Sequence, residues 1–470
     1  MLQITPLRRA AIGTVTALSL LSLGSSFLGA SAVQAQTLPQ PLPPIEQPQD
    51  KPLTPTLIQG DGLTNPVSVT GEIRGMWVVR DSLTSPQKIR NVVALAKKYG
   101  FNTLFVQVRG RGDAFYNSRF EPRAEELAGQ SLDFDPLATT LEEAHREGLE
   151  VHAWMNTFLV WSKGRRPYSS RHVVNQHPEW LVQDKNGRRR TTPTSDCEGG
   201  FLDPAITEVQ QFTRNVFLDV VERYPIDGIH FDYVRFPSNQ YSFSQTSLNA
   251  FRAHMALQLS ENDRAYADSK AKKNRLAYYY LFRKQWHEWR KELVAETVNA
   301  ISDAAHKVRP SLIVSAAVFP NYDVASVDKG QGWHEWLQEG YLDAVCPMTY
   351  NKSTEVVAAQ VRDAVRHSAG RPVIPGVGAY QMPAASAIAK GQVCRQLGAS
   401  GLNFFSYDGM TRNGRTEAYL AKVSTSLFTT PTLAPNWQRP VQTAQNTVTN
   451  GLDGVTENRN ENELDLRPGR

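Results

Sequence analysis

The sequence predicts an α/β fold, a (β/α)8 barrel with long loops after its second, third and fourth strands. Eight short apolar runs alternate with helical patterns between residues 70 and 428. Such alternation is typical of parallel strands joined by right-handed crossovers. The longest insertions follow strands, where the active-site loops of a barrel lie. An open doubly wound sheet is the main alternative, but no G-x-G-x-x-G motif follows the first strand, which favours the barrel.

The predicted elements follow one another in a regular order. The strands cover residues 73–79, 102–110, 149–158, 227–234, 312–319, 342–350, 372–380 and 401–409, and clear helical patterns cover 86–99, 136–147 and 207–223. The first two helices begin at Pro86 and Pro136, since proline suits the first turn of a helix. They stop at Gly100 and Gly148, because glycine past the last turn ends a helix without steric cost.

The insertions after strands differ in character. The second strand is followed by RGDAFYNSRFEPRAEELAG, and the third by a long loop with HPEWLVQDKNG and GGFLDPA. The fourth leads to a helical excursion over residues 243–308, which includes YYYLFRKQWHEWRKEL. We expect that aromatic stripe to pack the helix against the barrel, and a sugar-binding platform is the alternative.

The two ends of the chain are predicted to lie outside the barrel domain of residues 70–428. Residues 1–35 have the layout of a cleavable signal peptide, with two arginines, an apolar stretch and a V-Q-A cleavage site. A transmembrane anchor is disfavoured because hydroxyl residues interrupt the apolar stretch. Residues 36–69 are rich in Pro and Gln and predict an extended linker, and residues 429–470 predict a disordered polar tail. The expected location is therefore the periplasm or the cell exterior, with no transmembrane segment after cleavage.

Composition excludes several classes of function. A net charge of +5 over 470 residues gives no support to nucleic-acid binding. Three cysteines, Cys197, Cys346 and Cys394, are too few for a disulfide framework and lack metal-type spacing. With 41% hydrophobic residues, the chain has enough apolar side chains for a substantial core.

Polar and aromatic residues gather where the predicted strands end, which is the face of a barrel that carries active sites. Aromatic rings offer flat apolar surfaces to sugars, and polar side chains offer fixed donors and acceptors to hydroxyls. The predicted glycan-binding residues are Arg109, His152, Trp154, Asn156, Asp203, Tyr233, Arg235, Tyr350, Tyr380 and Tyr407. For Asp203 we prefer a role as the N-cap of a helix beginning at Pro204, with binding second.

Asp232 in PIDGIHFDYVRFP is the leading catalytic candidate, because the fourth strand delivers its carboxyl to the mouth of the barrel. A structural salt bridge with Arg235 or Arg109 is the alternative. Glycoside hydrolysis generally uses two carboxyl groups, one to protonate the leaving oxygen and one to attack or to activate water. The candidates for the second are Glu121, Asp203, Asp113 and Asp408. Glu121 in RFEPRAEEL is the preferred partner, although a loop acid there can also be purely structural.

Other chemistries find less support in the sequence. The histidines at 152, 172, 177 and 230 form neither an H-x-H at the first strand nor an H-E-x-x-H motif, which disfavours a metal hydrolase. No G-x-S-x-G nucleophile elbow is present, and PGVGAY lacks a phosphate-loop pattern. We therefore predict no metal at the active site and no organic cofactor.

Several motifs, taken in order, resemble a known bacterial family. EIRGMWVV, NTLFVQVRGRGDAFYNS, DPLATTLEEAHREGLEVHAWMNTF, HPEWLV, FLDPAITEVQQF and DGIHFDYVRFP are similar to the glycosyl hydrolase-like family 10, as are CPMTYN and PGVGAY. The resemblance covers about residues 70–428 and implies a (β/α)8 barrel and a secreted or envelope glycosidase. It points to Asp232 as a catalytic residue, with Glu121 as partner.

The expected function is an exported glycoside hydrolase that cleaves a cell-envelope polysaccharide, with peptidoglycan glycan strands as a candidate substrate. The alternative is a non-catalytic barrel that binds the glycan of the cell wall, since the same aromatic and polar residues would serve it. A second carboxyl group near Asp232 would separate the two, because only catalysis needs the pair.

Overall fold

The computed structural model describes residues 68–412, 417–431 and 435–438. The predicted signal peptide, nearly all of the predicted linker and the chain from residue 439 onward lie outside these described residues, so the domain bounds stay a prediction. Two short strands lie just outside the expected barrel limits: β1 (Ser68–Thr70) pairs antiparallel with β12 (Asn436–Gln438).

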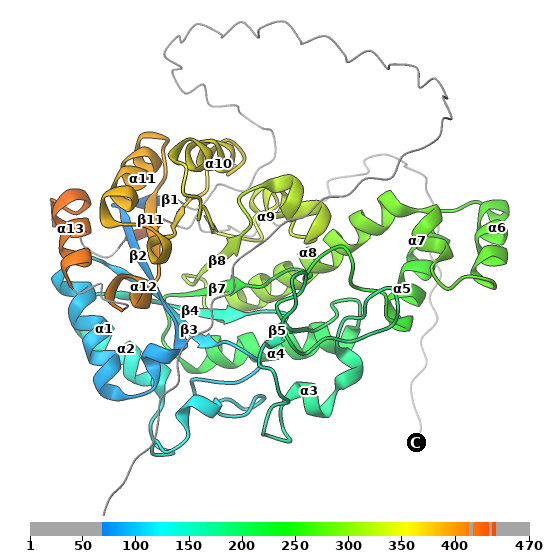
Figure 1. The fold of residues 1–470 in the computed structure, drawn as a ribbon, viewed down its shortest axis with the longest axis horizontal. Helices are drawn as coiled ribbons and strands as arrows, with labels where there is room; N and C mark the ends of the chain where they lie inside the picture. Colours follow the sequence, from blue (N-terminus) through cyan, green and yellow to red (C-terminus); the bar gives the residue numbers. More distant parts are fainter. Residues whose placement is uncertain (1–67, 413–416, 432–434, 439–470) are drawn as a thin grey trace, which may run out of the picture. The chain divides into compact units, whose positions relative to one another are not determined.

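Eight parallel strands form the barrel (Figure 1). They are β2 (Ile73–Val78), β3 (Thr103–Arg109), β4 (Glu150–Asn156), β7 (Gly228–Asp232), β8 (Ile313–Val318), β9 (Ala344–Pro347), β10 (Gly376–Val377) and β11 (Gly401–Phe405). Their order is β10-β11-β2-β3-β4-β7-β8-β9, and a parallel bridge between Val345 and Val373 links the two ends. The nearly closed ring confirms the predicted barrel.

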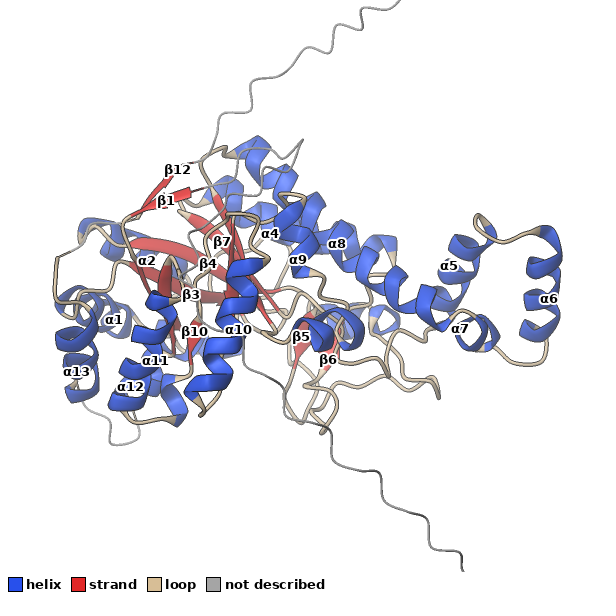
Figure 2. Cartoon of the chain, turned by 90° about the horizontal axis from the view of Figure 1, so that it is seen from above, coloured by secondary structure: helices blue, strands red, loops and turns tan. Residues whose placement is uncertain are grey.

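Helices surround the strands, as the view from above shows (Figure 2). The principal ones are α1 (Pro86–Lys98), α2 (Pro136–Arg146), α4 (Thr207–Arg223), α8 (Arg283–Val308), α9 (Trp333–Gln338), α10 (Thr354–Arg366), α11 (Ala384–Gln396) and α13 (Ala418–Leu427). Ser85 and Asp135 cap α1 and α2, because each side chain accepts a hydrogen bond from an N–H of the first turn. None of the helices in the described part of the chain has both the length and the apolar composition that a membrane span needs.

The predicted excursion after the fourth strand is helical throughout. It consists of α5 (Gln245–Ala256), α6 (Glu261–Ala271) and α7 (Ala277–Leu281), followed by α8. The aromatic stripe of α7 and α8 is largely buried: Trp286 lies 5.1 Å from Phe243 and 4.9 Å from Phe251, between ring centroids. The stripe therefore serves packing, but its ring partners belong to the start of the excursion itself.

The interior of the barrel is filled by large side chains in layers. Trp77, Phe105, Trp154 and Ile374 belong to one buried cluster, and Trp437 of β12 packs against it. Trp437 also donates a hydrogen bond from Nε1 to Oε2 of Glu150 at 3.2 Å, at the first residue of β4. The β1–β12 pair thus covers the N-terminal end of the barrel. The opposite end, where the C-terminal ends of the strands lie, stays open to ligands and is called the barrel mouth below.

Candidate functional site

Asp232 is the last residue of β7 and is only 8% exposed at the barrel mouth. Its Oδ2 accepts a hydrogen bond from Nε1 of Trp154 at 3.0 Å, and its Oδ1 accepts one from the main-chain N–H of Tyr233 at 2.7 Å. Burial raises the pKa of Asp232 to about 6, while these two hydrogen bonds and the Arg235 charge act in the opposite direction. A carboxyl group in this range can hold a proton near neutral pH and deliver it to a leaving group.

Glu198 is a second carboxylate near Asp232 that the sequence did not single out. Nη2 of Arg235 donates to its Oε1 at 2.8 Å, and the charge of Glu198 contributes to the raised pKa of Asp232. Its Oε2 has no hydrogen-bond partner among the described residues. Arg235, which is 5% exposed, therefore pairs with Glu198, and its charge also lowers the pKa of Asp232.

The loop after β4 places Glu198 by folding back on itself. β5 (Leu159–Trp161) pairs antiparallel with β6 (Gly200–Phe201), which brings the residues just before β6 back toward the mouth. Gly199 has φ +152°, and a Cβ there would lie 1.9 Å from the main-chain oxygen of Trp161. Only glycine fits this position. The two glycines after Glu198 were therefore the one feature of the sequence that could have indicated a tight approach of the main chain beside this residue.

Replacing Gly199 by alanine is expected to lower the free energy of unfolding by more than about 1 kcal/mol, because the new Cβ meets main-chain atoms at a disfavoured φ. Glycan cleavage should fall as well, since Glu198 is displaced. Urea denaturation and initial rates check both effects. Gly187→Ala is the matched control, because its φ is +77° but its nearest neighbour is 3.7 Å away. Equal losses in the two variants would contradict the close-contact explanation.

Aromatic rings line the other side of the mouth. The ring centroids of Tyr350 and Phe405 lie 5.3 Å apart, and Tyr380 lies 5.6 Å from Phe405. Trp154 lies 6.3 Å from Phe405, so this group continues to the residue that binds Asp232. Burial, together with the charge of Asp232, raises the pKa of Tyr350, which keeps its phenol protonated. Tyr380 is 46% exposed and offers its ring to a ligand.

A polar chain approaches the mouth from the first strands. Arg80 donates from Nη1 to Oε1 of Gln107 at 2.7 Å, and Nε2 of Gln107 donates to Oδ1 of Asn156 at 3.3 Å. Asn156 also donates from Nδ2 to the Gly110 oxygen at 2.6 Å. Burial, followed by the Arg111 charge, lowers the pKa of Arg80. The position of Asn156 at the mouth was predicted from the sequence, whereas those of Arg80 and Phe405 were not.

Arg109 and Glu121 form a buried ion pair. Nε and Nη2 of Arg109 donate to the two carboxylate oxygens of Glu121 at 2.8 and 2.6 Å, and the two side chains are 0% and 1% exposed. The Nη1 of Arg109 also donates to the main-chain oxygens of Asn156 and Thr157. The pair connects the loop after β3 to the end of β4, and Glu121 has no free carboxylate oxygen to offer a substrate.

Asp203 is fully buried in a structural network. It accepts hydrogen bonds from the side chains of Ser244 and Ser247 and from the main-chain N–H of Ala205. The expected cap on a helix beginning at Pro204 is wrong: α4 begins at Thr207 with Ile206 at its N-cap. The Asp203 carboxylate instead closes a turn before the helix and holds the start of α5 beside it.

His152 also lies away from the barrel mouth. It is fully buried near the start of β4, with its ring 4.8 Å from Phe105 and 6.2 Å from Trp437. These neighbours place it toward the covered N-terminal end of the barrel, so the structure does not bring it together with Asp232.

The predicted eighth strand ends earlier than expected, because the Ser406 side chain accepts a hydrogen bond from the Gly409 N–H and begins α12 (Tyr407–Thr411). Tyr407 therefore lines a separate cavity of about 310 Å³, together with Ser82 and Arg412. Asp408 accepts from Oγ of Ser82 at 2.7 Å in the same region.

Asp113 is the remaining acid considered as a partner. It is 2% exposed, accepts a hydrogen bond from the Arg111 N–H at 3.0 Å, and burial raises its pKa to about 6. Its charged neighbours are Arg111, Glu126 and Arg80, so it belongs to the polar side of the mouth.

Comparison with known proteins agrees with this architecture. The family described as Glycosyl hydrolase-like 10 matches residues 72–391. The Escherichia coli (strain K12) protein named Glycosyl hydrolase DigH is 25% identical over 277 residues, which cover 54% of this chain and 55% of that protein. Glycosyl hydrolase YngK of Bacillus subtilis (strain 168) is 24% identical over 323 residues, which cover 59% of this chain and 54% of that protein. The chain thus spans about half the length of these curated relatives.

Solved structures share the fold at low identity. The glycoside hydrolase domain of PgaB (BpsB) from Bordetella bronchiseptica matches with a TM-score of 0.55 and 14% identity, covering 74% of this chain and 98% of that one. The catalytic domain of a beta-amylase from Paenibacillus polymyxa matches with the same TM-score and identity. That match covers 77% of this chain and 100% of the beta-amylase domain. Both likenesses support a (β/α)8 barrel.

Proposed function

Since the chain belongs to the glycosyl hydrolase-like 10 family, we propose that it is an exported glycoside hydrolase that cleaves a polysaccharide of the cell envelope. The observation that carries the catalytic part is the buried carboxyl of Asp232, whose pKa is affected by the charges of Arg235 and of a second carboxylate, Glu198, that is ion-paired with Arg235. The export signal expected in residues 1–35 supports a periplasmic or extracellular location and an envelope substrate. Peptidoglycan glycan strands are the first substrate to test.

The two carboxyl groups suit different roles. Asp232 is the proposed general acid, because its raised pKa keeps part of the population protonated near pH 6. Glu198 is the proposed nucleophile or base, since its side chain is partly exposed and its Oε2 is a buried acceptor without a hydrogen-bond partner within the described chain. This assignment replaces Glu121 as the preferred second acid, because both oxygens of Glu121 are engaged by Arg109.

The rings of Tyr380, Tyr350 and Phe405 are the proposed platform for a sugar unit beside Asp232. Stacked sugar rings bury apolar C–H faces on aromatic surfaces, while hydroxyl groups need polar partners such as Asn156 and Arg80 on the opposite side. The mouth offers both kinds of surface.

Activity is expected to fall as the pH rises through about 6, because the general acid loses its proton there. Trp154→Phe removes an N–H that stabilises the carboxylate, so the pKa of Asp232 should rise. The falling limb of the pH–rate profile should therefore move to higher pH. Initial rates measured from pH 4 to 9 check the shift. A limb that stays in place or moves to lower pH would contradict Asp232 as the titrating acid.

The function is tested by incubating the chain without its predicted leader with isolated peptidoglycan, both with stem peptides and stripped of them. Released fragments are analysed by mass spectrometry beside Asp232→Asn and Glu198→Gln. Glu208→Gln is the control, because Glu208 is exposed at the start of α4. Fragments from the parent and control, but not from the two site variants, would support the proposal. Equal wall binding by all four proteins without release would favour the non-catalytic glycan-binding barrel.

A further inference from the structure

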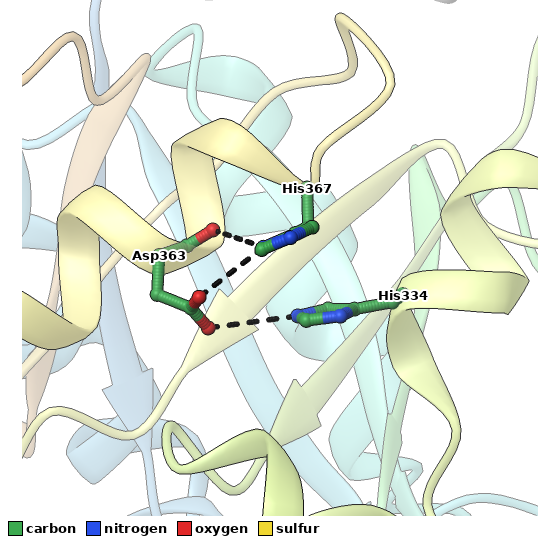
Figure 3. Close-up of side chains that lie close together, drawn as sticks. All are labelled: His334, Asp363 and His367. Atoms are coloured by element: carbon green, nitrogen blue, oxygen red, sulfur yellow. Dashed lines mark hydrogen bonds and ion pairs between the residues drawn. The ribbon is translucent and has the colours of Figure 1, made fainter.

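A group of two histidines and one aspartate lies between α9 and α10, outside the candidate site. His334 comes from the first turn of α9, and Asp363 and His367 lie one turn apart at the end of α10. One potential ligand atom from each residue lies within 4.8 Å of the other two. Figure 3 shows the three side chains converging from the two helices. They line a cavity of about 490 Å³ that shares no residue with the candidate site.

The separations suit a bound metal ion. Nε2 of His334 lies 3.6 Å from Oδ2 of Asp363, and potential ligand atoms of all three residues lie within 4.8 Å of one another. Metal–ligand bonds of about 2.0–2.1 Å in a tetrahedron place neighbouring ligand atoms about 3.4 Å apart. The spacing of Asp363 and His367 also matters, because residues four apart on a helix present side chains on one face.

His334 is held in place by its neighbours. Its ring stacks on Tyr322 with centroids 3.6 Å apart and planes 3° apart, and Trp333 meets it edge-on at 4.2 Å. Its Nε2 is buried and has no hydrogen-bond partner in the described part of the chain.

His367 is oriented by a hydrogen bond of its other ring nitrogen, as metal-binding histidines are. Its Nδ1 hydrogen-bonds the main-chain oxygen of Asp363 at 3.0 Å, which leaves Nε2 with the lone pair. The two imidazoles stack with centroids 4.2 Å apart, so a shared ion requires one ring to turn. His367 is the ring that can turn, because its side chain is 41% exposed whereas that of His334 is 17% exposed.

We propose that His334, Asp363 and His367 bind one divalent transition-metal ion that joins α9 to α10. Two imidazoles and one carboxylate, with a fourth position open to water, form a ligand set that zinc accepts. Asp323 also lines the cavity and adds negative charge that favours a cation. The ion would stabilise the outer wall of the barrel and take no part in glycan cleavage.

The test uses the tag-free chain without its predicted leader, stripped of metal and titrated with Zn²⁺ by calorimetry. We expect one ion per chain, and at least about tenfold weaker binding in His334→Ala and His367→Ala. His254→Ala is the matched control, because this α5 histidine lies 3.9 Å from one acid, Glu292, and outside the cluster. Equal binding by the parent and both cluster variants, or no binding by the parent, would overturn the proposal.

Three further tests guard against misfolded variants. Co²⁺ added to the parent should give the strong visible absorption of a tetrahedral site, and a weak octahedral spectrum would count against this ligand set. Asp363→Asn keeps the side-chain shape and both histidines, so it should fold like the parent. It should nevertheless bind Zn²⁺ more weakly than the parent, because it lacks the carboxylate. Zn²⁺ should raise the unfolding temperatures of the parent and of His254→Ala more than those of the three cluster variants, because an ion that binds the folded state adds stability.

Discussion

Replacing Asp232 by asparagine is expected to lower kcat by roughly 10²–10⁴-fold, the usual contribution of a positioned general acid. Asparagine has nearly the same shape, but its single side-chain oxygen can accept the hydrogen bond from Tyr233 or the one from Trp154, because Asp232 uses a different oxygen for each. What it lacks is the proton for the leaving oxygen. Initial rates on purified glycan fragments measure the loss.

The same variant should lose less stability than the parent as the pH rises through about 6. The folded state raises the pKa of Asp232 from 3.8 to about 6, so ionising this buried carboxyl disfavours folding as the pH rises through that interval. The neutral amide does not carry that cost. Thermal unfolding at pH 7.5 therefore separates a chemical defect from a folding defect. A variant that retains full activity would remove Asp232 from the mechanism, and the proposed acid would have to be sought elsewhere at the mouth.

Replacing Glu121 by glutamine is expected to lower the free energy of unfolding by about 3–5 kcal/mol, because it leaves the guanidinium of Arg109 buried without its counter-charge. Nε and Nη2 of Arg109 lose charged acceptors, and the end of β4 loses support through Nη1. Urea denaturation followed by tryptophan fluorescence measures the change.

A paired variant distinguishes structure from chemistry at this position. Arg109→Met combined with Glu121→Leu replaces both charges by apolar groups, so it should recover much of the stability that the single change loses. Recovery of activity together with stability would assign the pair a structural role. A stable paired variant with no activity would instead return Glu121 to consideration as a catalytic acid.

The difference between Glu121 and Glu198 shows where sequence reasoning stops. Both are loop acids that follow a strand, and each has a plausible place near the mouth. Glu121 forms a buried ion pair with Arg109, twelve residues away in the sequence. Glu198 pairs with Arg235, 37 residues away, and stays partly exposed. The choice of partner depends on how the β4 loop folds back, which no local pattern encodes.

Tyr407 illustrates a smaller failure of the same kind. The run GLNFFSYDG is apolar enough to predict a strand through residue 409, but the side chain of Ser406 caps a helix and ends the strand at Phe405. Tyr407 then faces a different cavity, and Phe405 takes the place beside Tyr350 and Tyr380. A serine can occupy either a strand end or a cap, so this boundary needed tertiary information.

The barrel, the ends of its first helices and the position of Asp232 at the end of a strand could all be predicted from the sequence. These features follow from short-range regularities: short apolar runs, prolines at helix starts, and glycines after helices. Tertiary packing was needed to show which carboxylate accompanies Asp232, which arginine is buried with Glu121, and that His334 lies beside Asp363 and His367. Those contacts join side chains from separate elements, and their hydrogen bonds and burial exist only once the chain is packed.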